Sequence, residues 1–217
     1  MKKNPLKRNW IASATMGLAC TAASAQLAMP VERPELKPGD TWTYRVLDNW
    51  TKKETNRYTM VYATEENDRW MFRWQGLTDG KTSTLMFNKD LQPCRTLRNS
   101  NSPVCGGTMK FPLTEAGKHS FKELPWSNGN GHYSADCEVK GIETVEVPAG
   151  KFEAVKIACK GFWTRLFEGS SSGRFDQTVW YAPSIRQQVK NEYNDLYSNG
   201  QPNVRNLTEL VEFKPAP

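Results

Sequence analysis

Large apolar side chains recur at every second position in the first part of this chain. A period of two places them on one face of a β-strand, with the intervening polar residues on the other face. The alternating sets are Trp42, Tyr44 and Val46; Tyr58, Met60 and Tyr62; and Trp70, Phe72 and Trp74. The Asp79-Gly80 pair is typical of a hairpin turn and predicts a fourth strand over 82–87. The pattern therefore predicts a meander of antiparallel strands.

The second part of the chain continues as strands separated by turn residues. The predicted strands cover 133–139, 145–157 with a turn at Pro148-Ala149-Gly150, 161–168, 174–182, 185–197 and 207–213. Polar stretches at 92–107 and 123–131 predict loops, and 113–118 could form one helical turn. No amphipathic helix of real length is evident, so the pattern predicts an all-β protein.

Residues 1–25 have the features of a cleaved secretory signal peptide. Lys2, Lys3, Lys7 and Arg8 precede a short apolar run at 10–19, and Ala23-Ser24-Ala25 matches a cleavage site. The run is shorter than the roughly 20 residues of a membrane span, so no membrane span is expected. We expect a single domain over 26–217 in a bacterial periplasm. Acylation at Cys20 is disfavoured, because Gly17 occupies the place of the usual apolar residue.

Removing this leader changes the charge balance. The chain has 29 Lys and Arg against 23 Asp and Glu, but four of the cations and none of the acids lie in the leader. The remaining 25 cations and 23 acids give a net charge of +2, which does not indicate nucleic acid as a partner. The mean hydropathy of -0.68 favours a soluble protein.

Four cysteines remain after the leader, and an even number in an exported chain indicates two disulfides. Three connectivities are open. We favour Cys94–Cys105, which brackets a polar loop, and Cys137–Cys159, which brackets a predicted hairpin. Each bond would stabilise the fold by about 3 kcal/mol in the chain-entropy account.

Two signatures resemble a group of exported bacterial proteins of unknown function. They are the hairpin ETVEVPAGKFEAVKI at 143–157 and the sequence WYAP at 180–183, and the opening KPGDTWTY at 37–44 is similar too. The resemblance covers about 37–195. It implies a curved antiparallel sheet or half-barrel of about nine to twelve strands with little helix, similar to periplasmic lipoprotein carriers. It implies no catalytic residue. Arg186 stands where the group's pattern has a glycine.

The chain contains few candidates for chemistry. Gly169–Gly173 matches Gly-x-Ser-x-Gly, but a predicted strand follows it, so a hairpin loop is the better interpretation. His132 and Asp136 would lie about 13 Å apart along a strand, which is too far to share one ion. Cys137 is better used in a disulfide. We therefore predict no metal site and no cofactor, and an enzyme is disfavoured.

The aromatic rows are the candidate binding residues. They are Trp42, Tyr44, Trp70, Phe72, Trp74, Trp163 and Trp180. They could form the core between the sheet and its cover, which is the simpler interpretation. They could instead form a concave surface that holds a lipid or another apolar molecule, because a curved sheet without a covering helix leaves an apolar face. A sugar-binding platform is a further alternative.

The favoured hypothesis is a soluble periplasmic protein that binds a ligand without catalysis. The alternatives are assembly with a cell-envelope protein through a sheet edge, and an envelope-polymer hydrolase. A binder should contain a cavity lined by Trp42, Trp70 and Trp74, and an assembly factor should have a filled core and a long open edge. A hydrolase requires His119 or His132 close to a serine or carboxylate.

Overall fold

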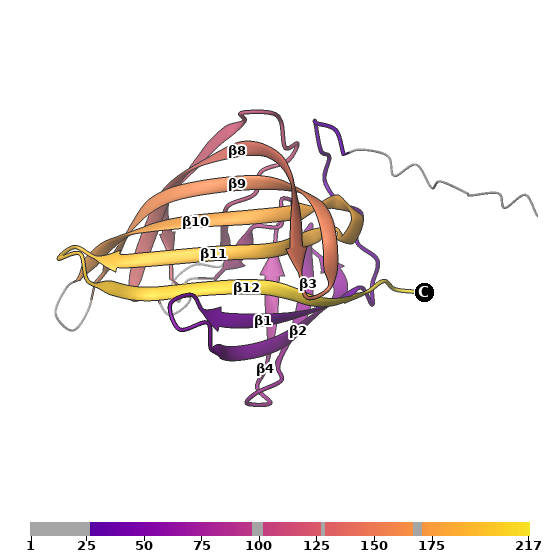
Figure 1. Cartoon of the computed structure of the whole chain (residues 1–217), viewed down its shortest axis with the longest axis horizontal. Helices are drawn as coiled ribbons and strands as arrows, with labels where there is room; N and C mark the ends of the chain where they lie inside the picture. Colours follow the sequence, from indigo (N-terminus) through magenta and orange to yellow (C-terminus); the bar gives the residue numbers. More distant parts are fainter. Residues whose placement is uncertain (1–26, 97–101, 127–128, 167–170) are drawn as a thin grey trace, which may run out of the picture.

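In the computed structural model, twelve strands form one antiparallel sheet (Figure 1). The structure describes residues 27–96, 102–126, 129–166 and 171–217. The strands are β1 (Thr41–Asp48), β2 (Glu54–Glu66), β3 (Arg69–Gly76), β4 (Thr82–Phe87), β5 (Pro93–Arg95), β6 (Val104–Cys105), β7 (Lys118–Pro125), β8 (Gly131–Val147), β9 (Gly150–Arg165), β10 (Ser172–Ala182), β11 (Gln187–Tyr197) and β12 (Pro202–Lys214). The predicted all-β curved sheet is confirmed.

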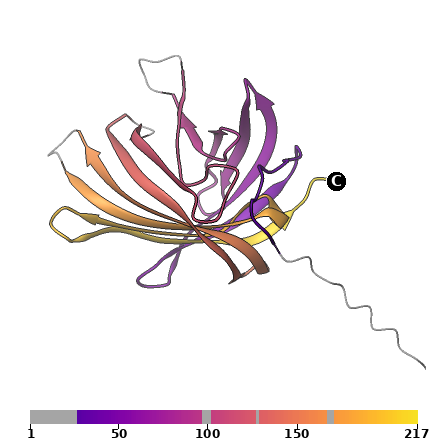
Figure 2. The same cartoon turned by 90° about the horizontal axis from the view of Figure 1, so that it is seen from above.

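The sheet consists of two meanders joined by the pairing of the first strand with the last. Its order is β6-β5-β4-β3-β2-β1-β12-β11-β10-β9-β8-β7. It curls until its two edges approach each other, which gives the cup seen in Figure 2. Arg95 on β5 donates hydrogen bonds across the gap to the carbonyl oxygen of Pro125 (2.7 Å) and to the Tyr133 hydroxyl (3.2 Å).

Several elements differ from the sequence prediction. The expected loop over 92–107 contains the short strands β5 and β6, and β7 was not predicted. The segment 113–118 holds a turn rather than a helical turn, because Leu113 instead forms an isolated bridge with Val31. A single 3₁₀ turn, η1 (Pro183–Ile185), precedes β11.

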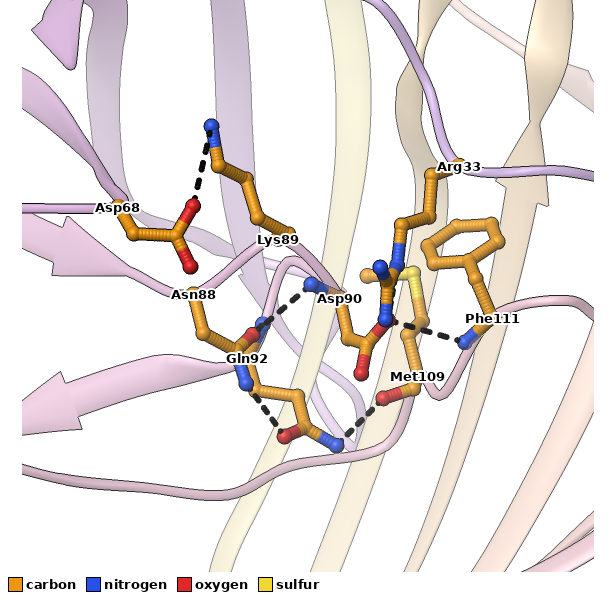
Figure 3. A network of polar contacts seen from close by, with 8 residues as sticks. All are labelled: Arg33, Asp68, Asn88, Lys89, Asp90, Gln92, Met109 and Phe111. Atoms are coloured by element: carbon orange, nitrogen blue, oxygen red, sulfur yellow. Dashed lines mark hydrogen bonds and ion pairs between the residues drawn. The ribbon is translucent and has the colours of Figure 1, made fainter.

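The concave side of the sheet carries the core, and a crossing segment over 106–113 fills part of it. Met109, Phe111 and Leu113 of this segment are buried. Polar contacts fasten the segment to the loop after β4 (Figure 3). Gln92 Nε2 donates to the Met109 carbonyl oxygen (2.6 Å), while Asp90 accepts from the backbone of Phe111 and from Arg33.

Both predicted disulfides are confirmed. Cys94–Cys105 joins β5 to β6, and Cys137–Cys159 joins β8 to β9 between directly paired residues. The alternative connectivities are therefore excluded.

The backbone conformation at Arg186 is one that favours glycine. Its φ of 61° and ψ of 22° are left-handed, a conformation that glycine adopts without steric cost. Here the arginine gains a compensating ion pair, because its Nη2 lies 2.8 Å from Oδ1 of the fully buried Asp40. Its guanidinium also stacks over Phe213. The turn is therefore retained without glycine.

Three sequence features lie partly or wholly outside the described residues. They are the expected leader over 1–25 with Cys20, the cleavage point before Gln26, and the first two residues of the Gly169–Gly173 match.

Candidate functional site

An interior cavity of about 440 Å³ lies within the curl of the sheet. This volume is in the usual range of about 300–1,000 Å³ for small-molecule sites. One part of its lining is an aromatic wall of Phe121, Trp126, Tyr133, Trp163, Phe175 and Tyr193. Met60, Phe87, Leu91 and Met109 line it from the first meander and from the crossing segment. The cavity therefore lies between the two halves of the sheet.

The polar part of the lining comes from the inward positions of neighbouring strands. On β11, Asn191, Tyr193 and Asp195 follow one another with the period of two and line the cavity. Gln177 lines it from β10, where it pairs with Tyr193. Polar residues at core-facing positions of a strand are unusual unless they are hydrogen-bonded or functional.

Asp195 is the buried charge of the site. Its Oδ1 accepts from Trp163 Nε1 (3.2 Å), and its Oδ2 accepts from Asn203 Nδ2 (3.0 Å). The Tyr193 hydroxyl lies 3.5 Å from Oδ2. Burial raises the pKa of Asp195, and the hydrogen bonds from Asn203, Trp163 and Tyr193 oppose this rise. The carboxylate is therefore held in place by three donors but still costs desolvation energy.

A β-bulge directs Asn203 toward Asp195. The β11–β12 register runs from Asp195 opposite Val204 to Leu196 opposite Pro202, which leaves Asn203 as the extra residue. Bulges commonly redirect a side chain beside a functional site. Asn203 also lines a shallower surface hollow with Trp50 and Arg205, so it lies where the interior cavity approaches the surface.

An amide pair forms the second polar group. Gln177 Nε2 donates to Asn191 Oδ1 (3.1 Å). Among the described residues, neither Gln177 Oε1 nor Asn191 Nδ2 has a hydrogen-bond partner, and neither is a fully buried unpaired atom. Both residues line the interior cavity, so these two atoms are available to a ligand there.

The aromatic wall is a connected series of ring contacts. Tyr133 contacts Phe121 with ring centroids 5.4 Å apart and Phe175 at 6.2 Å. Phe175 in turn lies 5.5 Å from Tyr193. Tyr133 and Tyr193 are half-buried, and both line the interior cavity. The wall can therefore contact the apolar face of a bound molecule.

The structure disperses the seven aromatic residues that the sequence pattern grouped together. Trp42, Tyr44 and Phe72 are fully buried, and Trp42 Nε1 donates to the Ile185 carbonyl oxygen (2.9 Å). Trp70 and Trp74 lie beside them on β3, with Trp70 beneath Lys89 and Trp74 against Tyr58. None of these five residues lines the interior cavity, whereas Trp163 does.

Trp180 lies on the opposite face of the sheet. The inward positions of β10 are occupied by Val179 and Tyr181, and Trp180 alternates with them. Its ring is covered by Lys156 and Lys190, and its Nε1 donates to Glu143. It is therefore separated from Trp163 by the sheet itself.

Neither histidine is part of a complete hydrolase arrangement in the described part of the chain. His132 Nε2 lies 3.4 Å from the exposed carboxylate of Glu123, but no serine hydroxyl contacts this ring there. His119 Nε2 lies 3.1 Å from the Gly107 carbonyl oxygen, and burial lowers the pKa of His119.

The described residues offer neither a clustered metal site nor a membrane-spanning helix. They contain no group of three or more His, Cys, Asp or Glu side chains able to hold a metal ion. They also contain no helix with the length and apolar character needed to cross a membrane.

Comparison with known proteins finds solved structures at low sequence identity and with TM-scores below 0.5. No family model matches the chain, and no curated protein matches its sequence. A proposed exported protein with a YmcC-like fold from Bacteroides fragilis is 16% identical (TM-score 0.49, covering 85% of this chain and 99% of that one). A proposed lipoprotein from Parabacteroides distasonis is 11% identical (0.47, 85% and 99%). The hypothetical lipoprotein YmcC from Escherichia coli is 13% identical (0.38, 83% and 86%).

Proposed function

We propose that this chain is an exported, non-catalytic binding protein that holds a small molecule in the interior cavity. The observation that carries this proposal is the cavity itself, with an aromatic wall and a few convergent polar groups inside a nearly closed sheet. Export to a periplasm is supported by the leader-like residues 1–25 and by both disulfides.

The lining defines what the ligand must offer. An apolar surface is required against Tyr133, Phe175 and Tyr193, which would suit a lipid or another apolar molecule. Polar groups are required opposite Gln177 and Asp195, because a buried polar group left without a partner is costly. The ligand therefore combines an apolar face with hydrogen-bonding groups.

Assembly with a cell-envelope protein through a sheet edge has less support. Edge pairing requires a row of free backbone groups. The edge strand β6 has only two residues, and the end of β7 is contacted by Arg95 from the opposite edge.

Native mass spectrometry of the protein purified from periplasm without detergent tests the proposal. We expect additional mass that disappears after organic extraction or denaturation. Gln177→Trp, which places a large ring in the interior cavity, should abolish the additional mass. Thr178→Trp is the matched control, because the neighbouring side chain lies on the other face of β10, and it should keep the mass. Equal retention by both variants would contradict binding in the cavity.

A further inference from the structure

The polar lining of the interior cavity consists mainly of neutral amides. Gln177, Asn191 and Asn203 contribute amides, while Asp195 is the one carboxylate and Arg95 the one guanidinium of this lining. An amide offers both donors and acceptors, and a hydroxyl group also donates and accepts. A ligand with several hydroxyl groups would therefore match this lining more closely than a ligand with one kind of polar group.

A charged ligand is disfavoured by the groups already present. The lining holds one cation and one anion, Arg95 and Asp195, so an anion that gains from Arg95 also lies in the same cavity as the Asp195 carboxylate. A cation would compete with guanidinium groups that already cover two rings of the aromatic wall. Arg95 lies 5.3 Å from the Tyr133 centroid and Arg165 lies 5.8 Å from the Trp126 centroid.

A hydrocarbon chain fits only the aromatic wall. It would displace water from Gln177 Oε1, Asn191 Nδ2 and the remaining acceptor sites of Asp195 without replacing those hydrogen bonds. A carboxylate has about four acceptor positions, and the contacts to Trp163, Asn203 and Tyr193 occupy at most three of them. At least one acceptor position is therefore left for a hydroxyl donor.

Sugar rings combine the two required surfaces. The axial C–H groups of a pyranose form an apolar face that packs on aromatic rings, and its hydroxyl groups project from the ring edge. In the interior cavity, the rings of Phe175 and Tyr193 lie close to Asp195 and to the Gln177–Asn191 amide pair. We propose that the ligand of the interior cavity is a neutral sugar, stacked on the aromatic wall and hydrogen-bonded by Asp195, Gln177, Asn191 and Asn203.

This inference rests on the proposed function, because it names the class of molecule held in the same cavity. Saturation-transfer difference NMR tests it on the intact protein with glucose, galactose, mannose, N-acetylglucosamine and cellobiose as probes. We expect saturation transfer to ring protons from at least one of these sugars. Asn191→Leu should weaken binding of that sugar at least tenfold, because the variant keeps the size of the side chain but loses the amide.

Asn194→Leu is the matched control, since Asn194 lies on the same strand and on the outer face. It should leave sugar binding unchanged. Circular dichroism and thermal unfolding establish that each variant folds, and Gln177→Leu replaces Asn191→Leu if the latter does not. Equal weakening by the inner and outer variants would overturn the placement of the sugar in the cavity.

N-phenyl-1-naphthylamine, an apolar fluorescent probe, separates the two proposals. Binding of this probe, blocked by Gln177→Trp, without a signal from any sugar would overturn the sugar class and leave the binding function standing. The absence of sugar binding, probe binding and co-purified mass would overturn both.

Discussion

At the scale of single residues, Asp195 is the buried carboxylate of the interior cavity. The side chain is buried on β11, and its burial outweighs three hydrogen bonds, so its pKa in the folded protein is raised. The unfolded chain should show the ordinary value near 3.9. Between these two values the folded state binds more protons than the unfolded state.

We therefore predict that Asp195 makes the protein less stable as pH rises. Its favourable contribution is complete below the unfolded pKa and is lost as pH rises through the folded pKa, with a slope of at most about 1.4 kcal/mol per pH unit. Urea unfolding from pH 3 to 8 should show this dependence in the wild type and lose it in Asp195→Asn. Parallel curves for the two proteins would mean that Asp195 does not titrate differently on folding.

At the scale of elements, the short strands β5 and β6 depend on their disulfide. They contain three and two residues, whereas β8 and β9, joined by the other disulfide, contain 17 and 16. Strands this short form too few backbone hydrogen bonds to persist alone. Pro93 of β5 also lines the interior cavity, so order at this edge shapes the site.

Replacing both cysteines of the pair, Cys94→Ala with Cys105→Ala, should release this edge. We expect loss of hydrogen-exchange protection at 94–95 and 104–105, with a loss of up to about 3 kcal/mol in the free energy of unfolding. Cys137→Ala with Cys159→Ala is the control, and it should preserve protection along β8 and β9. Retained protection at β5 and β6 would show that other contacts hold them.

The strand pattern was predictable where apolar residues alternate, as in β1, β2 and β3, and β4 was predictable from the Asp79-Gly80 turn before it. The long strands β8 and β9 were predicted as separate shorter strands, because glycines interrupt the alternating pattern. Gly141 has a φ of 117° beside the β8–β9 irregularity, and a side chain at Gly161 would collide with Phe175. The strand β7 was missed because its register shifts between Phe121 and Leu124, around the left-handed Glu123.

The candidate site was less predictable than the sheet. The rows of aromatic residues in the sequence belong mainly to the core, where Trp42 and Phe72 are fully buried. The useful signal was the appearance of Asn191 and Asp195 at the inward positions of a strand that also carries Val189 and Tyr193. Even this signal does not reveal Asn203, because the bulge that directs it depends on the register between β11 and β12.

At the scale of the whole molecule, Arg95 holds the two edges of the sheet together. It donates to the Pro125 carbonyl oxygen and the Tyr133 hydroxyl, and its guanidinium covers the Tyr133 ring. These contacts join β5 of the first meander to β7 and β8 of the second. Their loss would leave both edges exposed to pairing with another chain.

Arg95→Ala should therefore open the curled sheet. We expect a loss of about 1.5–3 kcal/mol in the free energy of unfolding, the usual cost of a hydrogen bond to a charged group. Exchange should become faster in β5 and β7, and light scattering should detect concentration-dependent self-association. Arg73→Ala removes an exposed arginine from β3 and should change none of these measurements. A monomeric Arg95→Ala protein with unchanged exchange in β7 would mean that side-chain packing alone closes the sheet. In that case the sheet would keep its curl without the arginine, while the interior cavity would still lose one of its lining side chains.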